Sequence, residues 1–88
     1  MPLKKRDHYW VYMVRCKNGT LYTGYTNDLE HRLRMHNEGK GAKYLRGKAP
    51  VTLVWSKAYR NFRCAVRKEH EIKRLNRVQK EEIIEDYG

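Results

Sequence analysis

The sequence predicts a small mixed α/β domain of the α+β type, with its elements in the order strand, strand, helix, strand, helix, helix. Three observations support this prediction. Two short segments rich in aromatic and β-branched residues flank an Asn-Gly pair, which is typical of a β-hairpin. A third segment of this kind lies in the middle of the chain. Three of the asparagines stand where helix-favouring sequence begins, as N-caps do.

The first two strands are expected over residues 9–16 and 20–25. Between them, Lys17-Asn18-Gly19 can form either a two-residue turn at Asn18-Gly19 or a three-residue loop in which Gly19 is left-handed. Because side chains alternate between the two faces of a strand, this choice decides which residues of the hairpin share a face.

The loop length decides whether Tyr12 and Tyr22 lie on the same face of the hairpin. With a two-residue turn, Tyr12 and Tyr22 face opposite sides of the hairpin. With a three-residue loop, Tyr12 pairs with Gly24 and the two tyrosines share one face. We favour the three-residue loop, which would leave open space over the Tyr12 ring where a substrate could approach.

The first helix is expected over residues 28–38, because Asn27 and Glu30 fit a capping box and Gly39 fits a C-terminal stop. Residues 39–50 then form a loop with three glycines and four basic residues.

The third strand is expected over residues 51–59, where apolar side chains alternate at Val51, Leu53 and Trp55. Asn61 can cap a second helix that runs to about Leu75. Asn76 and Gln79 fit another capping box, which opens a last helix.

The charge is strongly positive and unevenly distributed. The 88 residues contain 20 Lys and Arg against 10 Asp and Glu, a formal net charge of +10. Between Glu38 and Glu69 there are nine basic residues and no acid, while four of the acids lie in the last eight residues. This pattern favours a polyanion such as nucleic acid as partner over a uniformly solvated surface. The expected nucleic-acid contacts are Gly24, Lys40, Lys43, Arg46 and Lys48.

Several classes of protein are not expected. Cys16 and Cys64 are the only cysteines, so neither a disulfide framework nor a zinc site is indicated. The basic start of the chain has no apolar run after it, and no segment approaches membrane-spanning length. We therefore expect one cytoplasmic domain over residues 1–88, with a flexible N-terminus at residues 1–8 and no membrane partner.

The second expected helix places a carboxylate on its apolar face. That face is formed by Phe62, Ala65, Val66 and Ile72. Glu69 lies near its middle, where a charge is costly unless it is paired or bound to a metal. The plain alternative is an ion pair with Lys73, four residues further along the helix.

Five polar side chains are expected at inward positions of four elements: Tyr12, Tyr22, Arg32, His36 and Glu69. Each has an ordinary explanation. Tyrosine is common in strands, the stem of an arginine often covers apolar surface, and a histidine on a core face is usually a satisfied core residue. However, a core this small seldom holds five such groups unless they meet in a site.

The order of these residues resembles the GIY-YIG nuclease superfamily, over residues 9–73. The pattern is Val11-Tyr12, then a Tyr-x-Gly segment at residues 22–24, a helix with Arg and then His-Asn, and a later helix with Glu. The resemblance is closest to small stand-alone members that are similar to the catalytic part of structure-specific endonucleases. Trp10 and Thr23 depart from the motif, and the asparagine that some members carry after the glutamate has no clear match.

The resemblance implies a three-stranded antiparallel sheet flanked by helices and roles for individual residues. Tyr12 and Tyr22 match the signature tyrosines, with Gly24 as the signature glycine. Arg32 matches the phosphate-binding arginine, and His36 the histidine of many members. Glu69 matches the glutamate that binds a metal ion, one Mg²⁺ or Mn²⁺.

The expected activity is hydrolysis of DNA phosphodiester bonds with a divalent metal, in repair or recombination. A phenol has a pKa of about 10, so the tyrosine that acts as base needs help from Arg32, His36 or the metal; the sequence leaves open which tyrosine this is. The alternative is a non-catalytic binding module for structured RNA or DNA. A protein partner is a further expected source of specificity, and the oligomeric state is left open.

Overall fold

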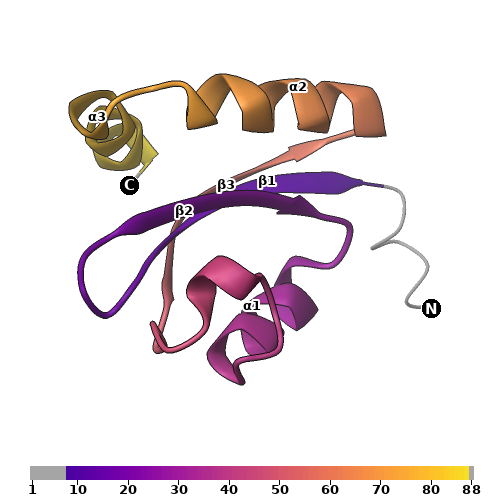
Figure 1. The fold of residues 1–88 in the computed structure, drawn as a ribbon. Coiled ribbons are helices and arrows are strands. Elements are labelled where there is room, and N and C mark those ends of the chain that lie inside the picture. Colours follow the sequence, from indigo (N-terminus) through magenta and orange to yellow (C-terminus); the bar gives the residue numbers. More distant parts are fainter. Residues whose placement is uncertain (1–7, 88) are drawn as a thin grey trace.

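The structure is a computed structural model that describes residues 8–87 (Figure 1). Its elements are β1 (Tyr9–Arg15), β2 (Leu21–Thr26), α1 (Leu29–Asn37), the short 3₁₀ helix η2 (Lys43–Leu45), β3 (Thr52–Tyr59), α2 (Phe62–Lys73) and α3 (Arg77–Tyr87). The predicted fold class and order of strands and helices are confirmed. The expected flexible N-terminus lies outside the described residues, except for His8.

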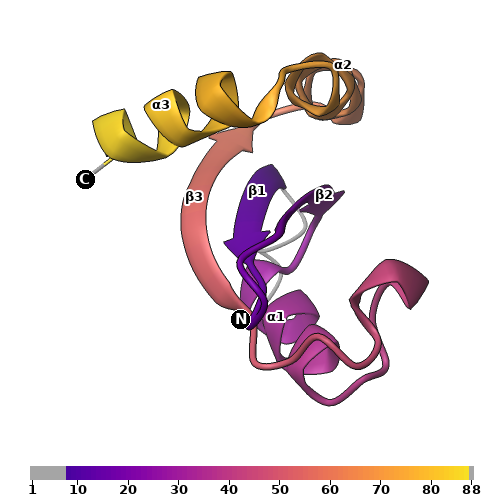
Figure 2. The same cartoon turned by 60° about the vertical axis from the view of Figure 1, so that its left-hand side comes forward.

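The strands form one antiparallel sheet in the order β2-β1-β3. Figures 1 and 2 show α2 and α3 over one face of this sheet, and α1 with the loop after it over the other. Each face has its own cluster of buried apolar residues. On the α2 face the cluster includes Met13 and Ile72, and on the α1 face it includes Val14 and Leu45. No helix within residues 8–87 is long and apolar enough to cross a membrane.

The hairpin closes through the three-residue loop, as we expected. Gly19 has φ +91°, and the Cys16 N–H donates to the Thr20 carbonyl at 2.8 Å. Tyr12 is therefore paired with Gly24, and Tyr22 lies on the same face as Tyr12. This register brings the two tyrosines together.

The cap of α1 differs from the prediction. The residue at the N-cap is Asp28, whose carboxylate accepts from the His31 N–H at 3.2 Å, and not Asn27. The Thr26 hydroxyl accepts from the Asp28 N–H at 3.1 Å, which holds Asp28 at the start of the helix. A carboxylate there also interacts favourably with the helix dipole. The predicted stop is confirmed, since Gly39 has φ +78°.

A bulge in β3 corrects the expected alternation of Val51, Leu53 and Trp55. The register shifts between Met13, which pairs with Trp55, and Val14, which pairs with Leu53. One extra residue of β3 therefore separates the two pairs, and a bulge of this kind reorients the side chains that follow it. As a result Val51 and Leu53 pack on the α1 face, whereas Trp55 packs on the α2 face.

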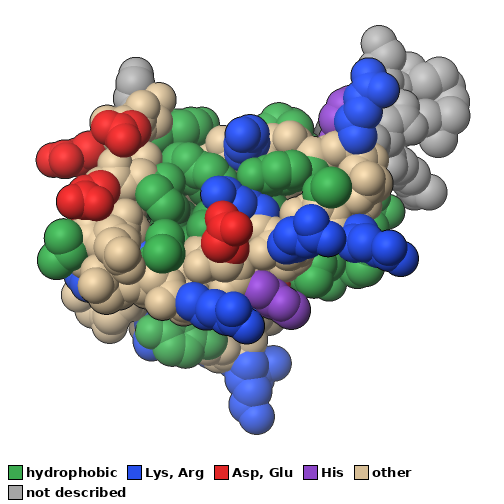
Figure 3. Space-filling view, turned by 90° about the horizontal axis from the view of Figure 1, so that it is seen from above, with side chains coloured by type: hydrophobic (Ala, Val, Ile, Leu, Met, Phe, Trp, Pro, Cys, Tyr) green, Lys and Arg blue, Asp and Glu red, His purple; other side chains and the backbone are tan. Residues whose placement is uncertain are grey.

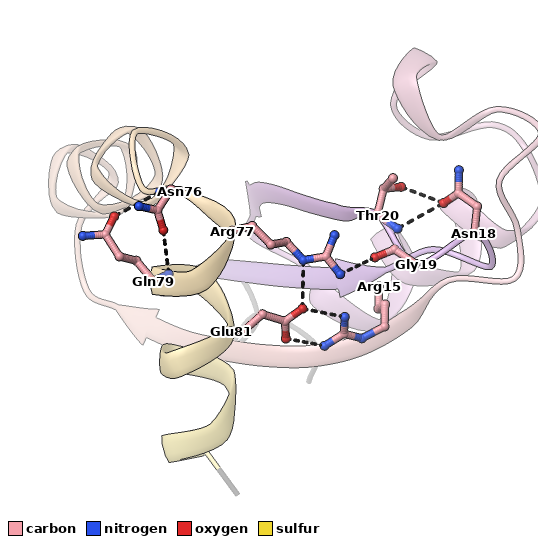
Figure 4. Close-up of polar contacts among 8 residues, drawn as sticks. All are labelled: Arg15, Asn18, Gly19, Thr20, Asn76, Arg77, Gln79 and Glu81. Atoms are coloured by element: carbon pink, nitrogen blue, oxygen red, sulfur yellow. Dashed lines mark hydrogen bonds and ion pairs between the residues drawn. The ribbon is translucent and has the colours of Figure 1, made fainter.

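Both later helix starts follow the prediction. The Asn61 side chain accepts from the Cys64 N–H at 2.8 Å. Asn76 and Gln79 form a full capping box: the Gln79 N–H donates to Asn76 Oδ1 at 2.9 Å, and the Asn76 N–H donates to Gln79 Oε1 at 3.0 Å (Figure 4).

A charged cluster, which we call the hairpin clamp, joins α3 to the β1–β2 hairpin (Figure 4). Its members are Arg15, Gly19, Arg77 and Glu81. Arg15 donates both terminal nitrogens to the two oxygens of Glu81, at 2.9 and 2.8 Å. Arg77 donates to Glu81 and to the Gly19 carbonyl, both at 2.9 Å. This cluster holds the last helix against the β1–β2 hairpin.

Candidate active site

Tyr12 and His36 form a buried pair on the α1 face of the sheet. Their exposed fractions are 2% and 1%, and Tyr12 Oη lies 2.8 Å from His36 Nε2. The Ala42 N–H donates to His36 Nδ1 at 3.3 Å, so Nδ1 is an acceptor and the ring proton is on Nε2. In the neutral ring, His36 therefore donates to the Tyr12 oxygen.

Two glycines allow this pair to fit. A Cβ at Gly41 would overlap Nδ1 of His36, so only glycine lets the loop pass so close to the imidazole. A Cβ at Gly24 would lie 2.7 Å from Tyr12 Oη. The expected open space over the Tyr12 ring is therefore absent, because the phenol lies against Gly24 and fills it. We had also expected Gly24 to contact nucleic acid, but Gly24 is buried.

Burial controls the ionisation of both groups. Removal from water, followed by the nearby Tyr22, raises the pKa of Tyr12 well above the ordinary value, and Glu69 acts in the same direction. Arg32 opposes this rise. Burial and then Arg32 lower the pKa of His36. His36 is therefore neutral near physiological pH, and Tyr12 is a protonated phenol.

Tyr22 is the more accessible tyrosine. It is only half-buried. Its ring centroid lies 6.4 Å from that of Tyr12 and 5.8 Å from that of His36. Arg32, on α1, is also half-buried, and its charge acts on the pKa of both Tyr12 and His36. These four residues are thus brought together around the hairpin.

Glu69 approaches from the other face of the sheet. It belongs to α2, which packs on β1 and β2, and it is 6% exposed. The Lys73 ammonium lies 2.9 Å from one of its oxygens, and His70 Nε2 lies 3.6 Å from the other. The ion pair considered from the sequence is therefore formed. Besides burial, the charge of Glu69 raises the pKa of Tyr12, and besides the hydrogen bond to Glu69, Tyr22 raises the pKa of Lys73, so α2 and the hairpin interact electrostatically across the sheet.

The apolar face of α2 is as expected except at its start. Ala65 and Ile72 are fully buried, whereas Phe62 is 50% exposed. The Phe62 ring makes edge contacts with Tyr9 and Tyr25, each with centroids 5.5 Å apart.

Among the residues that the structure describes, Glu69 is the one buried carboxylate that could bind a metal. Within residues 8–87 no three His, Cys, Asp or Glu side chains are grouped closely enough to hold an ion by themselves. A single carboxylate still fits Mg²⁺, which usually keeps several waters and binds substrate phosphates.

The basic loop between α1 and β3 is largely exposed. Lys40, Lys43 and Arg46 are exposed, and Lys40 lies 3.7 Å from Glu38. Lys48 lies over the ring of Tyr44, with Nζ 3.6 Å from the ring centroid. On the opposite face of the molecule, Figure 3 shows further Lys and Arg side chains spread over the middle and right of the view, while acidic side chains lie mainly at its left-hand end, with one near the centre.

Sequence reasoning missed three residues that shape the site: Gly41, Ala42 and Tyr44. The loop composition alone gave no reason to place a glycine and a backbone N–H against His36, because that contact depends on how the loop folds back. The aromatic character of Tyr44 within a basic loop was the one available signal.

Comparison with known proteins identifies a family domain and similar chains. The model of the GIY-YIG catalytic domain matches residues 8–82. The chain is 48% identical over 79 residues to UPF0213 protein OB0043 of Oceanobacillus iheyensis, covering 90% of this chain and 92% of the relative.

Two solution NMR structures are also similar. The UPF0213 protein BH0048 of Bacillus halodurans is 43% identical, with a TM-score of 0.62, over 92% of this chain and 86% of that chain. The protein EF2693 of E. faecalis is 34% identical, with a TM-score of 0.63, over 91% of this chain and 85% of that chain.

Proposed function

This chain belongs to the family of GIY-YIG catalytic domains, within the GIY-YIG nuclease superfamily, and on that premise we propose that it is a divalent-metal-dependent endonuclease that hydrolyses DNA phosphodiester bonds. The observation that carries the proposal is the meeting of Tyr12, Tyr22 and His36 beside Arg32, with a buried carboxylate across the same edge strand. Removing polar groups from water costs free energy unless they are paired, so their concentration in so small a fold supports a functional site.

We assign the proton-accepting role to Tyr22. A general base has to reach the proton of the attacking water. Tyr12 is 2% exposed and lies against Gly24, which leaves no path for a water. Tyr22 lies on the same face, is half-buried, and contacts the rings of both Tyr12 and His36.

Tyr12 and His36 then act as positioning residues beneath Tyr22. The Ala42 N–H fixes the tautomer of His36, and the His36 Nε2–H holds the Tyr12 oxygen at 2.8 Å. Neutral, buried and hydrogen-bonded, the pair forms a rigid support for the Tyr22 ring.

Arg32 is the proposed contact for the scissile phosphate. Its guanidinium is always charged and matches the geometry of a phosphate. The effect of its charge on both Tyr12 and His36 supports a position beside the pair. There it would offset the negative charge that develops as the phosphate is attacked.

Glu69 is the proposed metal ligand. One Mg²⁺ or Mn²⁺ would be held by this carboxylate, with water and phosphate oxygens completing its coordination. When bound, such an ion polarises the phosphate and stabilises the leaving oxygen. Lys73 has to leave Glu69 for this, which its position allows, because 49% of its side chain is exposed.

The basic loop is the proposed grip on the nucleic acid. Its exposed cations, Lys40, Lys43 and Arg46, bind backbone phosphates without reading sequence. Specificity then comes from the shape of the substrate or from a protein partner, with DNA repair or recombination as the setting.

A second candidate function has one observation in its favour. The Glu69 carboxylate is already neutralised by Lys73 at 2.9 Å, as it would be in a module that binds nucleic acid without cleaving it. That module would keep the basic loop and the exposed aromatic rings as its contacts.

The test is incubation of the pure protein with labelled linear, flapped and branched DNAs and RNAs in Mg²⁺, Mn²⁺ or EDTA. The nuclease reading expects cleavage of at least one DNA that needs the metal and stops in EDTA. Binding of the same nucleic acids with no cleavage in any metal would establish the binding module instead.

A further inference from the structure

Tyr44 is an exposed ring on an anchored support. It lies in η2 with 51% of its surface exposed, beside Leu45, which is 1% exposed and belongs to the core on the α1 face. Backbone bonds secure the segment: the Leu45 N–H donates to the Ala42 carbonyl at 2.9 Å, and the Lys48 N–H donates to the Leu45 carbonyl at 3.1 Å. The ring is thus held out to solvent by a fixed loop.

The ring of Tyr44 is connected to the candidate active site. It is stacked on Tyr22, with centroids 5.8 Å apart and an angle of 20° between the planes. Tyr22 in turn contacts the rings of Tyr12 and His36. One continuous row of rings therefore runs from the buried pair to the surface.

A cation lies against the exposed ring. Lys48 Nζ is 3.6 Å from the Tyr44 centroid, a cation–π contact that is weak at an exposed site. A phosphate offers the ammonium a stronger, charge-assisted partner. The phosphate of an approaching nucleotide can therefore bind the Lys48 ammonium, and the base of that nucleotide can then stack on the Tyr44 ring where the ammonium had been.

We propose that Tyr44 is a stacking platform for an unpaired base, so that the preferred substrate of the site is a single-stranded or splayed segment of nucleic acid. This inference rests on the proposed nuclease function, because the bound strand is a substrate only if the protein cleaves it. An aromatic ring can stack only on a base whose face is open, and in a duplex those faces are covered by neighbouring bases. Stacking of this kind tolerates any base, because each has a π-face.

The acid-free loop supports this partner. Lys43 and Arg46 flank the Tyr44–Leu45 step, and Lys48 follows, with no acid from residue 39 to residue 68. Alternating cations and an aromatic ring are the arrangement that binds a single strand, with phosphates on the cations and a base on the ring. If Tyr44 only covered Tyr22, the flanking residues would need no common sign of charge.

The experiment measures binding in EDTA, where no metal-dependent cleavage occurs. Short single-stranded DNA and RNA oligonucleotides that carry 2-aminopurine, and the matching duplexes, are titrated with wild type, Tyr44→Phe and Tyr44→Leu. Tyr87→Leu is the matched control, since Tyr87 is 50% exposed but lies on α3. Thermal melting confirms that each variant is folded.

We expect Tyr44→Leu to weaken single-strand binding at least about fivefold and to abolish the quenching of 2-aminopurine. Tyr44→Phe and Tyr87→Leu should match the wild type, and duplex binding should change little. Equal losses for Tyr44→Leu and Tyr87→Leu, or equal losses for single strand and duplex, would overturn the proposal. The DNA and RNA arms identify which nucleic acid supplies the base.

A second measurement needs no variant. Tetranitromethane nitrates exposed tyrosines, and mass spectrometry of the wild type should show Tyr44 protected by a single strand while Tyr87 remains reactive. Unprotected Tyr44 at saturating oligonucleotide would contradict the platform. If binding depends on Tyr44 but no cleavage occurs in Mg²⁺ or Mn²⁺, the stacking role of Tyr44 is supported and the nuclease function is refuted. If cleavage occurs but binding does not depend on Tyr44, the nuclease function is supported and the stacking role is refuted.

Discussion

Glu69 of α2 and Glu81 of α3 are both paired with cations, but the two pairings do different things. Glu81 accepts from Arg15 at 2.8 and 2.9 Å and from Arg77 at 2.9 Å. Arg15 belongs to β1, so this pair joins the last helix to the first strand. Glu69 is paired at 2.9 Å with Lys73, one turn along its own helix, and this pair joins α2 only to itself.

Burial makes the contrast sharper. Only 8% of the Glu69 side chain is exposed, against 35% for Glu81. A carboxylate at the surface with two guanidiniums costs little to keep charged. For a buried carboxylate such as Glu69, which has a half-exposed lysine and a more distant histidine as neighbours, the cost of removal from water can exceed the gain from pairing. Glu81 is thus used to hold the fold together, whereas the proposed function gives Glu69 a second partner, the metal ion.

The largest effect on cleavage is expected from a change at Tyr22 in the candidate active site. Tyr22→Phe removes only the hydroxyl, and we expect metal-dependent cleavage to fall by about 10²- to 10⁴-fold, the range for loss of a general base. Tyr12→Phe should lower cleavage less, although it leaves the buried Nε2–H of His36 without its partner and so reduces stability. Single-turnover cleavage and thermal melting of both variants measure this. A greater loss of cleavage in Tyr12→Phe than in Tyr22→Phe would exchange the two roles.

The next effect tests the crowding around His36. Gly41→Ala places a methyl group against Nδ1 of a buried ring that is held at both nitrogens, and we expect a loss of about 1–3 kcal/mol of stability. Urea unfolding gives the free energy. His36→Ala makes room for the methyl group, so Gly41→Ala should cost much less in that background. Strict additivity of the two changes would show that they do not touch.

A smaller effect is expected from a change in the hairpin clamp. Glu81→Gln leaves the fold intact but removes the charge that Arg15 and Arg77 share, so the melting temperature should fall by a few degrees. Cleavage by the folded protein should be unchanged. Slower cleavage at a temperature where the variant is fully folded would show that the hairpin clamp also affects the active site, so that Glu81 would not be purely structural.

The smallest effect concerns pH. The hydrogen bonds from Arg15, followed by the one from Arg77, lower the pKa of Glu81 from about 4.5 to about 2. A lowered pKa means that the clamp contributes its full stability above about pH 4.5 and loses it as the pH falls toward about 2. The protection factors of the α3 amides, which compare observed exchange with the intrinsic rate at each pH, should therefore fall over this interval in the wild type. In Glu81→Gln the protection of the α3 amides should fall less between the same two pH values. An equal fall in both proteins would show that groups other than Glu81 cause it.

Local sequence signals predicted much of this molecule. Asn61, Asn76 and Gln79 act within one helical turn, and Gly19 sets the hairpin register that puts Tyr12 and Tyr22 on one face. Such features depend on a few adjacent residues, so the sequence contains them directly.

What the sequence did not predict depends on which of several possible local contacts forms, or on contacts between distant residues. At α1, Asn27 and Asp28 are equally good caps by type, and the bond from Thr26 decides between them. The bulge in β3 follows from packing against both faces of the sheet. The Arg15–Glu81 pair joins residues 66 positions apart, which no local pattern indicates.

Whether Glu69 binds a metal ion is tested most directly by comparing Glu69→Gln with Glu71→Gln and Glu81→Gln. Glu71 is the control on the same helix, paired with Lys68 at 2.8 Å and exposed. Metal-dependent cleavage, DNA affinity in EDTA and melting temperature are measured side by side.

We predict that Glu69→Gln alone loses cleavage, by about 100-fold or more, because it removes the proposed metal ligand. Its DNA affinity should be equal or tighter, since a negative charge near the phosphate is gone. Its stability should change by at most about 1 kcal/mol, because the Lys73 ammonium is half-exposed. Retained cleavage in a clearly destabilised Glu69→Gln protein would contradict the account, since Glu69 would then be a structural partner of Lys73 and nothing more.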